Sequence, residues 1–247
     1  MTTLHGRLDL PEHQPLFSTF SSIPVISISN SQRRPIPQAG WVRTIYHGLP
    51  EQMLTPLPVK QEYFAFLGRI APEKGVDRAI EIARECGVPL KIAAKVDKVD
   101  REYYEEKIRP LIDGSNVEYI GEITDQQKAA FLSPAIALLV PIDWPEPFGL
   151  VMIEAMACGT PVIAFNRGSV PEIIEDGLTG FIVEDAKGAI GAAYRLPELS
   201  RAAIRKRFEE RFTARRMAQD YLAVYRSLMP RLRLVAGESP SIPHAVP

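Results

Sequence analysis

The chain has 247 residues, of which 46% are hydrophobic and 24% are charged, and its formal net charge is -1. This composition is ordinary for a globular protein with a buried core, and the small net charge favours neither nucleic acid nor an anionic membrane as a partner. No apolar run reaches the ~20 residues that a membrane-spanning helix needs, and the start lacks the apolar segment of a signal peptide, so we expect a cytoplasmic protein.

The first part of the chain, residues 1–62, is irregular and rich in proline and serine. Short strands are predicted at residues 25–29 and 42–46, and three prolines indicate a linker over residues 48–62. The stretch before the linker is too short for a core of its own. We therefore expect residues 1–47 to be the remnant of a larger N-terminal domain.

Residues 63–229 alternate short apolar runs with helical patterns, which is typical of βαβ units around a parallel sheet. The predicted strands are residues 63–67, 90–94, 117–120, 135–140, 161–164 and 180–183. The predicted helices are residues 76–86, 101–112, 125–132, 149–157 and 170–175. Thr124 and Gln127 form a capping box before the third helix. The pattern is mostly helical beyond Lys187, and residues 230–247 are expected to be a disordered tail.

This order of elements predicts an α/β fold, a Rossmann-like doubly wound parallel sheet. In such a fold, ligands bind at the carboxyl ends of the strands. The loops that follow the strands are therefore the places to look for chemistry.

The first such loop is Gly68-Arg69-Ile70-Ala71-Pro72-Glu73-Lys74-Gly75. Arg69 and Lys74 place two cations on one loop, flanked by glycines that let a ligand approach the backbone, which suits a pyrophosphate. A solvated basic loop is the alternative. The loop matches neither the Walker A pattern nor G-x-G-x-x-G, which argues against P-loop hydrolysis and ordinary dinucleotide binding.

Two glutamates, Glu146 and Glu154, flank the expected start of the helix at residues 149–157. Free N–H groups of Phe148, Gly149 and Leu150 would gather at this helix start, where anions bind. Carboxylates accept hydrogen bonds from hydroxyls, so the segment predicts a ligand that carries both hydroxyls and phosphates. For Glu154, a carboxylate on a largely apolar helix, a structural ion pair is the alternative.

Other polar segments carry weaker signals. Gly168-Ser169 can offer N–H groups at a further helix start, with Ser169 as the N-cap. His5 and His47 are isolated histidines, which are more often structural than catalytic. The alternating charges of residues 201–216 are typical of a solvated helix face.

In combination, these motifs resemble the retaining GT-B glycosyltransferases usually called family 4 or group 1. Residues 68–75 match the family's G-R-x-x-x-x-K-G loop, and Glu146 and Glu154 match its two glutamates with seven residues between them. The match continues in residues 155–162, 168–172 and 177–181. The resemblance therefore covers most of residues 63–228.

The resemblance implies a role for each residue. Arg69 and Lys74 would hold the donor diphosphate as the leaving group. Glu146 would bind hydroxyls of the transferred sugar, and Glu154 would accept from the ribose. His5, in a segment similar to the family's N-terminal domain, would lie near the donor sugar and join Arg69, Lys74 and Glu146 as a catalytic residue. The implied donor-binding residues are Gly68, Arg69, Lys74, Ile120, Glu146, Phe148, Gly149, Leu150 and Glu154. No metal or cofactor is expected, because cations and a helix terminus can stabilise the leaving group.

A whole enzyme of this family has two Rossmann-like domains, and most of the first has no counterpart here. We therefore expect a fragment, the C-terminal donor-binding half of a GT-B fold. It would transfer a sugar from a UDP- or GDP-sugar to an unknown acceptor with retention of configuration. The alternatives are a donor-binding module without turnover and, less well matched, a sugar-nucleotide epimerase.

The resemblance also predicts how the two parts are joined. Residues 45–50 would form the hinge, and a last helix near residues 213–228 would return to pack on the N-terminal part. A domain face left uncovered would be apolar, so self-association is expected.

Overall fold

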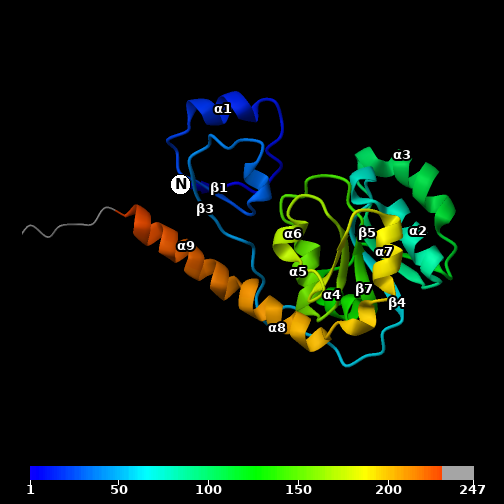
Figure 1. Cartoon of the computed structure of the whole chain (residues 1–247). Coiled ribbons are helices and arrows are strands. Elements are labelled where there is room, and N and C mark those ends of the chain that lie inside the picture. Colours follow the sequence, from blue (N-terminus) through cyan, green and yellow to red (C-terminus); the bar gives the residue numbers. More distant parts are fainter. Residues whose placement is uncertain (230–247) are drawn as a thin grey trace, which may run out of the picture.

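The structure, a computed structural model, describes residues 1–229 and consists of two unequal α/β units (Figure 1). The smaller unit carries a three-stranded sheet and the larger unit a six-stranded sheet. The tail predicted at residues 230–247 lies outside the described residues. Within residues 1–229, no helix is both long and apolar enough to cross a bilayer.

The larger sheet is parallel throughout and has the strand order β6-β5-β4-β7-β8-β9. Its strands are β4 (Tyr63–Arg69), β5 (Leu90–Lys95), β6 (Val117–Gly121), β7 (Ala135–Val140), β8 (Val162–Phe165) and β9 (Gly180–Val183). The chain builds outward from β4 in one direction and then from β7 in the other. A crevice is expected outside the carboxyl ends of these two strands, where the order reverses. The predicted doubly wound fold class is confirmed.

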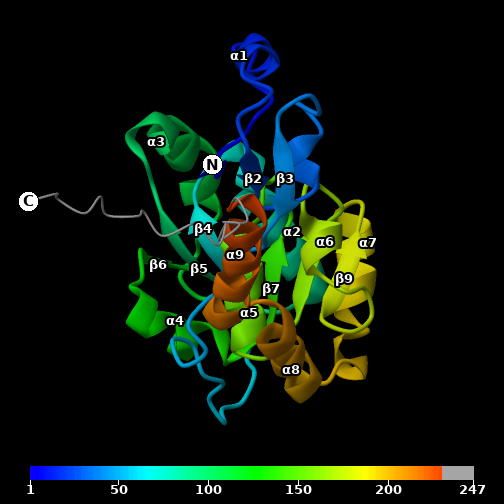
Figure 2. The ribbon, with the colours of Figure 1, turned by 90° about the vertical axis from the view of Figure 1, so that its left-hand side faces the viewer.

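Helices cover both faces of this sheet (Figure 2). One face packs against α2 (Val76–Cys86), α7 (Ala186–Ala193) and a π-helical turn, η4 (Tyr104–Ile108). The other face packs against α4 (Asp125–Leu132), α5 (Leu150–Ala157), α6 (Val170–Ile173) and α8 (Arg201–Arg211). Along β4, Phe64 and Phe66 belong to the first layer, whereas Tyr63 and Ala65 belong to the second, as the alternation of a strand requires. The remaining short helical elements are η2 (Pro72–Lys74), η3 (Lys98–Asp100), α3 (Arg101–Tyr103), η5 (Arg109–Leu111) and η6 (Leu196–Glu198).

Three predicted helices differ in detail from the observed ones. The helix predicted over residues 170–175 ends at Ile173, because Ile174 has an extended backbone. The helix predicted over residues 101–112 is divided into α3, η4 and η5. Pro110 explains the break, because proline lacks an N–H and its ring clashes with the carbonyl one turn earlier. The helix predicted over residues 149–157 begins at Leu150, since Gly149 has the left-handed φ of 80°. The capping box is confirmed, with the Thr124 N–H donating to Gln127 Oε1 at 2.8 Å.

The basic residues of α8 correct a further prediction. The Arg201 guanidinium donates to the Ala135 carbonyl at 2.9 Å and to Thr160 Oγ1 at 2.8 Å. Arg205 donates to the Leu54 carbonyl at 2.6 Å. Arg201 and Arg205 therefore hold α8 and the linker to the sheet. The prediction that residues 201–216 form a solvated helix face is wrong for these two arginines. This role could not be predicted from the sequence, because the acceptors are backbone carbonyls of residues far away in the chain.

The smaller unit is a parallel sheet with the order β1-β2-β3. Its elements are β1 (Thr2–Thr3), α1 (His13–Thr19), β2 (Val25–Ser27), η1 (Ser31–Arg33) and β3 (Trp41–Thr44). The expectation that it lacks a core was wrong, because four of its side chains form a buried cluster: Leu8, Val25, Ile36 and Ala39. Helix α1 was not predicted, because it buries none of its residues. Leu16 and Phe20 are 47% and 50% exposed, and self-association stays a prediction.

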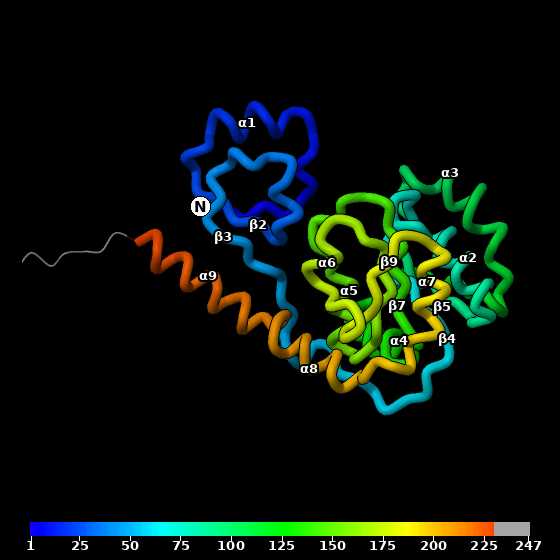
Figure 3. The backbone as a smooth tube through the Cα atoms, viewed as in Figure 1, coloured from blue at the N-terminus to red at the C-terminus, as the bar shows by residue number. Residues whose placement is uncertain are grey.

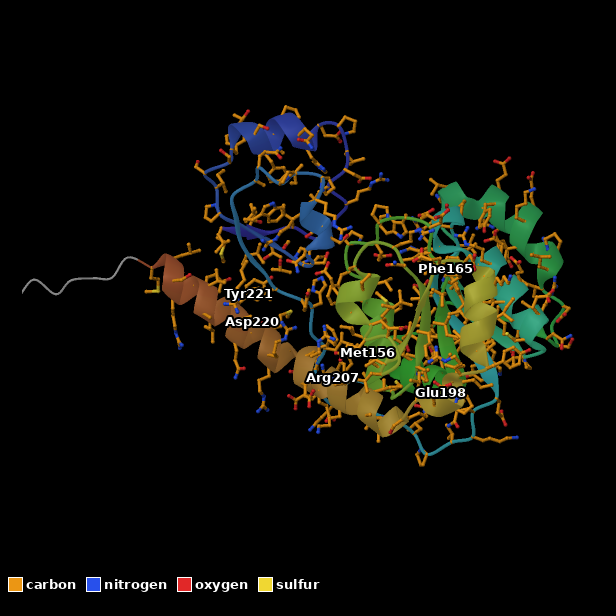
Figure 4. The ribbon with its side chains drawn as sticks, in the orientation of Figure 1. Met156, Phe165, Glu198, Arg207, Asp220 and Tyr221 are labelled. Carbon is orange, nitrogen blue, oxygen red and sulfur yellow. The ribbon has the colours of Figure 1, made fainter. Side chains whose placement is uncertain are left out.

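A long last helix, α9 (Ala214–Leu228), returns from the larger unit to the smaller one (Figure 3). Val224 is buried against Ile26 and Ile45 of the smaller unit. The hydroxyls of Tyr221 and Thr3 are 2.9 Å apart, and Figure 4 labels Tyr221 on α9. The predicted return of the last helix is confirmed.

The chain passes between the two units twice, and the two connecting segments are hydrogen-bonded to each other. The Leu49 N–H donates to the Phe212 carbonyl at 2.9 Å, and the Ala214 N–H donates to the Leu49 carbonyl at 2.8 Å. A Cβ on Gly48 would lie 2.2 Å from the Thr213 carbonyl oxygen, so this approach requires glycine. The hinge predicted near residues 45–50 is therefore packed tightly against the segment that leads into α9.

Candidate functional site

The loops after β4 and β7 meet where the strand order reverses. The Asp143 N–H donates to the Glu73 carbonyl at 2.9 Å, and Arg78 Nε donates to the Pro141 carbonyl at 2.8 Å. Gly75 has a left-handed φ of 73°, and a Cβ there would lie 2.2 Å from the Pro141 oxygen. The glycine that ends the predicted cationic loop is thus what lets the two loops touch.

Two adjoining pockets open between these loops and α5. The first is lined by residues that include Gly68, Lys74, Glu146, Gly149 and Leu150. The second shares Leu67, Gly68, Leu150 and Val151 with the first and extends to Lys95, Glu122, Lys128 and Glu154. Together they form one crevice, which runs from Lys74 at one end to Glu154 at the other. The sequence predicted Gly68, Lys74, Glu146, Gly149, Leu150 and Glu154 for this site, and the structure brings these six together.

An ion pair closes the first end of the crevice. Lys74 Nζ contacts Glu146 Oε2, and Trp144 Nε1 donates to the same oxygen at 3.1 Å. Lys74 Nζ also lies 4.7 Å from the centre of the Trp144 ring, within the range of a cation–π contact. Trp144 was not predicted from the sequence as a residue of this site. The side chains of Lys74 and Glu146 are 24% and 14% exposed, so both can reach a ligand in the crevice.

The start of α5 lines the middle of the crevice. No hydrogen bond from the N–H groups of Gly149, Leu150 and Val151 to another group of residues 1–229 is found. These donors and the helix dipole make a site for an anion. A Cβ on Gly149 would lie 2.7 Å from Met152 Cε and 3.3 Å from Glu146 Cγ, so glycine is needed at this helix start.

Ser169 supports the Glu146 loop from behind. Its N–H donates to the Glu146 carbonyl at 3.0 Å, and its buried hydroxyl donates to the Phe148 carbonyl at 2.8 Å. A Cβ on Gly168 would lie 2.4 Å from the Glu146 nitrogen. Ser169 is the N-cap residue of α6, as predicted, but its hydroxyl makes no capping bond. The prediction that its N–H is offered to a ligand was wrong, because both donors are used by the loop.

Glu154 lies at the second end of the crevice and is only 5% exposed. Lys128 Nζ donates to Glu154 Oε1 at 2.8 Å and lies 2.7 Å from Asp125 Oδ1. Glu154 Oε2 has no hydrogen-bond partner among residues 1–229. The alternative ion pair is therefore present through Oε1, and a ligand at Oε2 stays a prediction. Lys128 was not singled out from the sequence, because its partner is 26 positions away.

Arg69 is placed differently from Lys74. Its guanidinium lies 2.6 Å from the Glu73 carboxylate and 3.6 Å from the carboxylates of Asp97 and Asp100. It lines neither pocket. Arg69 is thus at the rim of the crevice and engaged by acids.

Two other predicted donor residues also lie outside the pocket walls. Ile120, on β6, is 37% exposed and lines neither pocket. Phe148 is buried beneath the loop, where its ring packs against Tyr46 and Phe212. Phe148 therefore shapes the loop with its side chain.

His47 links His5 to the site loop. The two imidazole rings are stacked with centroids 5.3 Å apart, and His47 meets Phe148 edge-on at 4.9 Å. The backbone around His5 is fixed by Gln32, whose Nε2 donates to the carbonyls of Leu4 and Gly6, each at 2.9 Å. Burial, with His5 and Arg216 nearby, lowers the pKa of His47. His5 itself lines neither pocket.

Residues 54–211, more than half of the chain, match the sequence model of the family glycosyl transferases group 1. An uncharacterized 41.2 kDa protein in the cps region of Klebsiella pneumoniae is 30% identical in an alignment 168 residues long, which covers 66% of this chain and 45% of that protein. The alpha-maltose-1-phosphate synthase of Mycobacterium tuberculosis is 29% identical in an alignment 183 residues long, gaps included, which covers 66% of this chain and 47% of the synthase. The chain spans about half the length of these relatives.

Solved structures give the same result for the fold. The Anabaena protein HepE in complex with UDP and glucose superposes with a TM-score of 0.79 at 22% identity, covering 92% of this chain and 71% of HepE. Sucrose-phosphate synthase from Thermosynechococcus elongatus superposes with a TM-score of 0.70 at 28% identity, covering 83% and 58%. The architecture is that of a GT-B glycosyltransferase with a partial N-terminal domain. On the strength of the match over residues 54–211, the chain belongs to the glycosyl transferases group 1 family.

Proposed function

We propose that this chain binds a nucleoside-diphosphate sugar, a UDP- or GDP-sugar, and serves as the donor half of a glycosyltransferase. The observation that carries the proposal is that one crevice joins Lys74, the start of α5, Glu146 and Glu154. The crevice thus offers a cation and free N–H groups for phosphates, and carboxylates for hydroxyls. The structural relative HepE is solved with UDP and glucose, which is consistent with such a ligand.

The diphosphate belongs between Lys74 and the first N–H groups of α5. A helix start and an ammonium both stabilise the negative charge that grows on a departing diphosphate. Lys74 contacts Glu146 in the structure, so a phosphate oxygen would share or replace that contact. Glu146 would then be free to accept hydrogen bonds from hydroxyls of the transferred sugar.

Arg69 can join the diphosphate only if its present ion pairs open. Asp97 and Asp100 each lie 3.6 Å from its guanidinium, which is a long distance for an ion pair. We propose that the diphosphate, as a stronger acceptor, draws Arg69 from these two acids. Its closer contact with Glu73, at 2.6 Å, orients the side chain along its own loop.

The donor assignment is tested by calorimetric titration of UDP-glucose and GDP-mannose into the wild type and Glu154→Ala. We expect one of the two ligands to bind the wild type, and its affinity to fall at least about tenfold in Glu154→Ala. Glu198→Ala is the matched control, because Glu198 lies on η6, away from the crevice (Figure 4). No binding of either ligand by the wild type would contradict the assignment.

We further propose that the bound sugar is transferred to an acceptor with retention of its anomeric configuration, as in family 4. Proton NMR of the product formed from the bound sugar nucleotide tests it, since retention gives first a product with the anomeric configuration of the donor. Turnover is expected to persist in EDTA, because the proposal assigns charge stabilisation to Lys74 and α5. A product of inverted configuration would contradict the mechanism.

A donor-binding module without turnover is the second candidate. It is favoured by one observation, the coverage of only about half of each curated relative. Binding of the donor without hydrolysis or transfer would support it, and recovery of transfer on addition of an N-terminal domain from a relative would establish it. The cytoplasmic location expected from the sequence stays a prediction.

A further inference from the structure

Lys128 and Glu154 form a largely buried ion pair at the second end of the crevice. The side chain of Glu154 is 7% exposed and that of Lys128 16% exposed. Lys128 uses one carboxylate oxygen of Glu154, Oε1, at 2.8 Å. The other oxygen, Oε2, is buried and has no hydrogen-bond partner within the part of the chain that the structure describes.

A buried carboxylate oxygen without a partner is costly, and such an atom in a native structure calls for an explanation. Because Glu154 lines the crevice, a ligand hydroxyl is a natural partner. The ion pair explains how the carboxylate keeps one oxygen for that purpose. With Oε1 bound to Lys128, the side chain has one orientation, and Oε2 is the oxygen left over.

We propose that Lys128 is a positioning residue, which holds Glu154 so that Oε2 accepts a hydrogen bond from a ribose hydroxyl of the donor. This inference rests on the proposed function of the crevice. It assigns to α4 a part in donor binding that acts through α5 and not through contact with the diphosphate.

Lys128 itself is firmly anchored. The capping box of Thr124 and Gln127 fixes the first turn of α4, and Asp125 in the same turn lies 2.7 Å from Lys128 Nζ. The ammonium thus meets two carboxylates, Asp125 and Glu154. Burial alone would lower the pKa of Lys128, but its hydrogen bonds to these carboxylates raise the pKa above the ordinary value. Lys128 is therefore charged at neutral pH.

The bond from Lys128 also determines which oxygen of Glu154 is left for a ligand. Without Lys128, the carboxylate would lose the contact that holds Oε1, and Oε2 would no longer be held in place to accept from a hydroxyl. Removing Lys128 should consequently weaken the binding of a nucleotide with ribose hydroxyls. It should have little effect on the binding of a nucleotide that lacks them.

The experiment is a calorimetric titration of UDP, GDP and their 2′,3′-dideoxy analogues into the wild type, Lys128→Met and Lys128→Arg. For the base that the wild type prefers, we expect Lys128→Met to weaken the ribonucleotide about tenfold and the dideoxy analogue less than about threefold. Lys128→Arg should restore most of the affinity. Lys91→Met is the matched control, since Lys91 pairs with Glu118 at 3.2 Å outside the crevice.

The outcomes separate the two proposals. Equal weakening of ribonucleotide and analogue by Lys128→Met, or no weakening of either, overturns the role of Lys128 and leaves the donor site intact. No binding of UDP or GDP by the wild type overturns both. If Lys128→Met fails to fold, Lys128→Arg and Glu154→Gln decide the matter. The inference then requires that Glu154→Gln lose discrimination between ribonucleotide and analogue, and that Lys128→Arg keep it.

Discussion

Lys74 Nζ contacts Glu146 Oε2, and this contact joins the loop after β4 to the loop after β7. The two residues are 72 positions apart in the chain. Their ion pair places a cation and a hydroxyl acceptor at the same end of the crevice, beside the free N–H groups of α5.

Lys74 is predicted to bind phosphate and not the nucleoside. In Lys74→Met, the affinity for UDP or GDP should fall at least about tenfold, because a charge-assisted contact is lost, whereas uridine or guanosine should bind as before. Isothermal calorimetry measures both. Lys206→Met, on the exposed face of α8, is the control. Equal loss of nucleoside and nucleotide binding would show that Lys74 acts only through the fold.

Gly168 is predicted to be essential for the Glu146 loop. Gly168→Ala brings a Cβ to 2.4 Å from the Glu146 nitrogen and also forces alanine to a φ of 56°. We expect a loss of unfolding free energy of about 3–5 kcal/mol, from overpacking together with backbone strain. Gly177→Ala is the matched control, because its φ is 74° but its Cβ would meet nothing within 4 Å. It should cost about 1–2 kcal/mol in urea unfolding. Similar losses in the two variants would refute the steric argument.

Glu172 is predicted to hold the two units together. Its carboxylate, on α6, accepts the N–H groups of Asn30 and Ser31 at 2.7 Å each and the Tyr46 hydroxyl at 3.0 Å. Burial, together with Glu172, raises the pKa of Tyr46 to about 12. In Glu172→Ala, hydrogen exchange at the Ser31 amide should accelerate at least about tenfold, with no change for Glu198→Ala. Unchanged exchange at Ser31 would mean that the units do not depend on this contact.

His47 is predicted to make stability depend on pH. Its pKa in the folded protein is lowered, chiefly by burial, so the unfolded chain takes up a proton at a higher pH than the folded protein does. The stabilisation is complete above the ordinary histidine pKa of about 6.5 and is lost as the pH falls through the folded value. The urea midpoint of the wild type should therefore drop between pH 7 and pH 5 by more than that of His47→Asn. Equal drops would exclude His47 as the cause.

Much of the larger unit could be predicted from the sequence because its signals are local. Unbroken apolar runs marked β4 and β7 as strands covered on both faces. Lys74 and Glu146 follow these two strands closely in the sequence, and Glu154 lies on the helix that comes after β7. The carboxyl ends of parallel strands share one edge of the sheet, so these residues had to converge. The structure brings them to one crevice, as predicted.

What escaped prediction depends on contacts between distant segments. Ser169 is the expected N-cap residue, but its donors serve Glu146 and Phe148 in another loop. Lys128 was not singled out, yet it pairs with buried Glu154. Arg201 was expected on a solvated helix face, yet it binds the carbonyl of buried Ala135. Sequence periodicity does not predict such pairs, because the partners of Lys128 and Arg201 depend on how α4 and α8 pack on the sheet.

Amide NMR with UDP and GDP shows directly whether the crevice between β4 and β7 binds a nucleoside diphosphate. We expect saturating nucleotide to shift the amide signals of Gly68, Gly149, Leu150 and Val151 more than those of any other region. Glu154→Ala should weaken this response. No shifts at saturation, or shifts confined to a different pocket such as the one lined by Gly87 and Asn116, would contradict binding in this crevice.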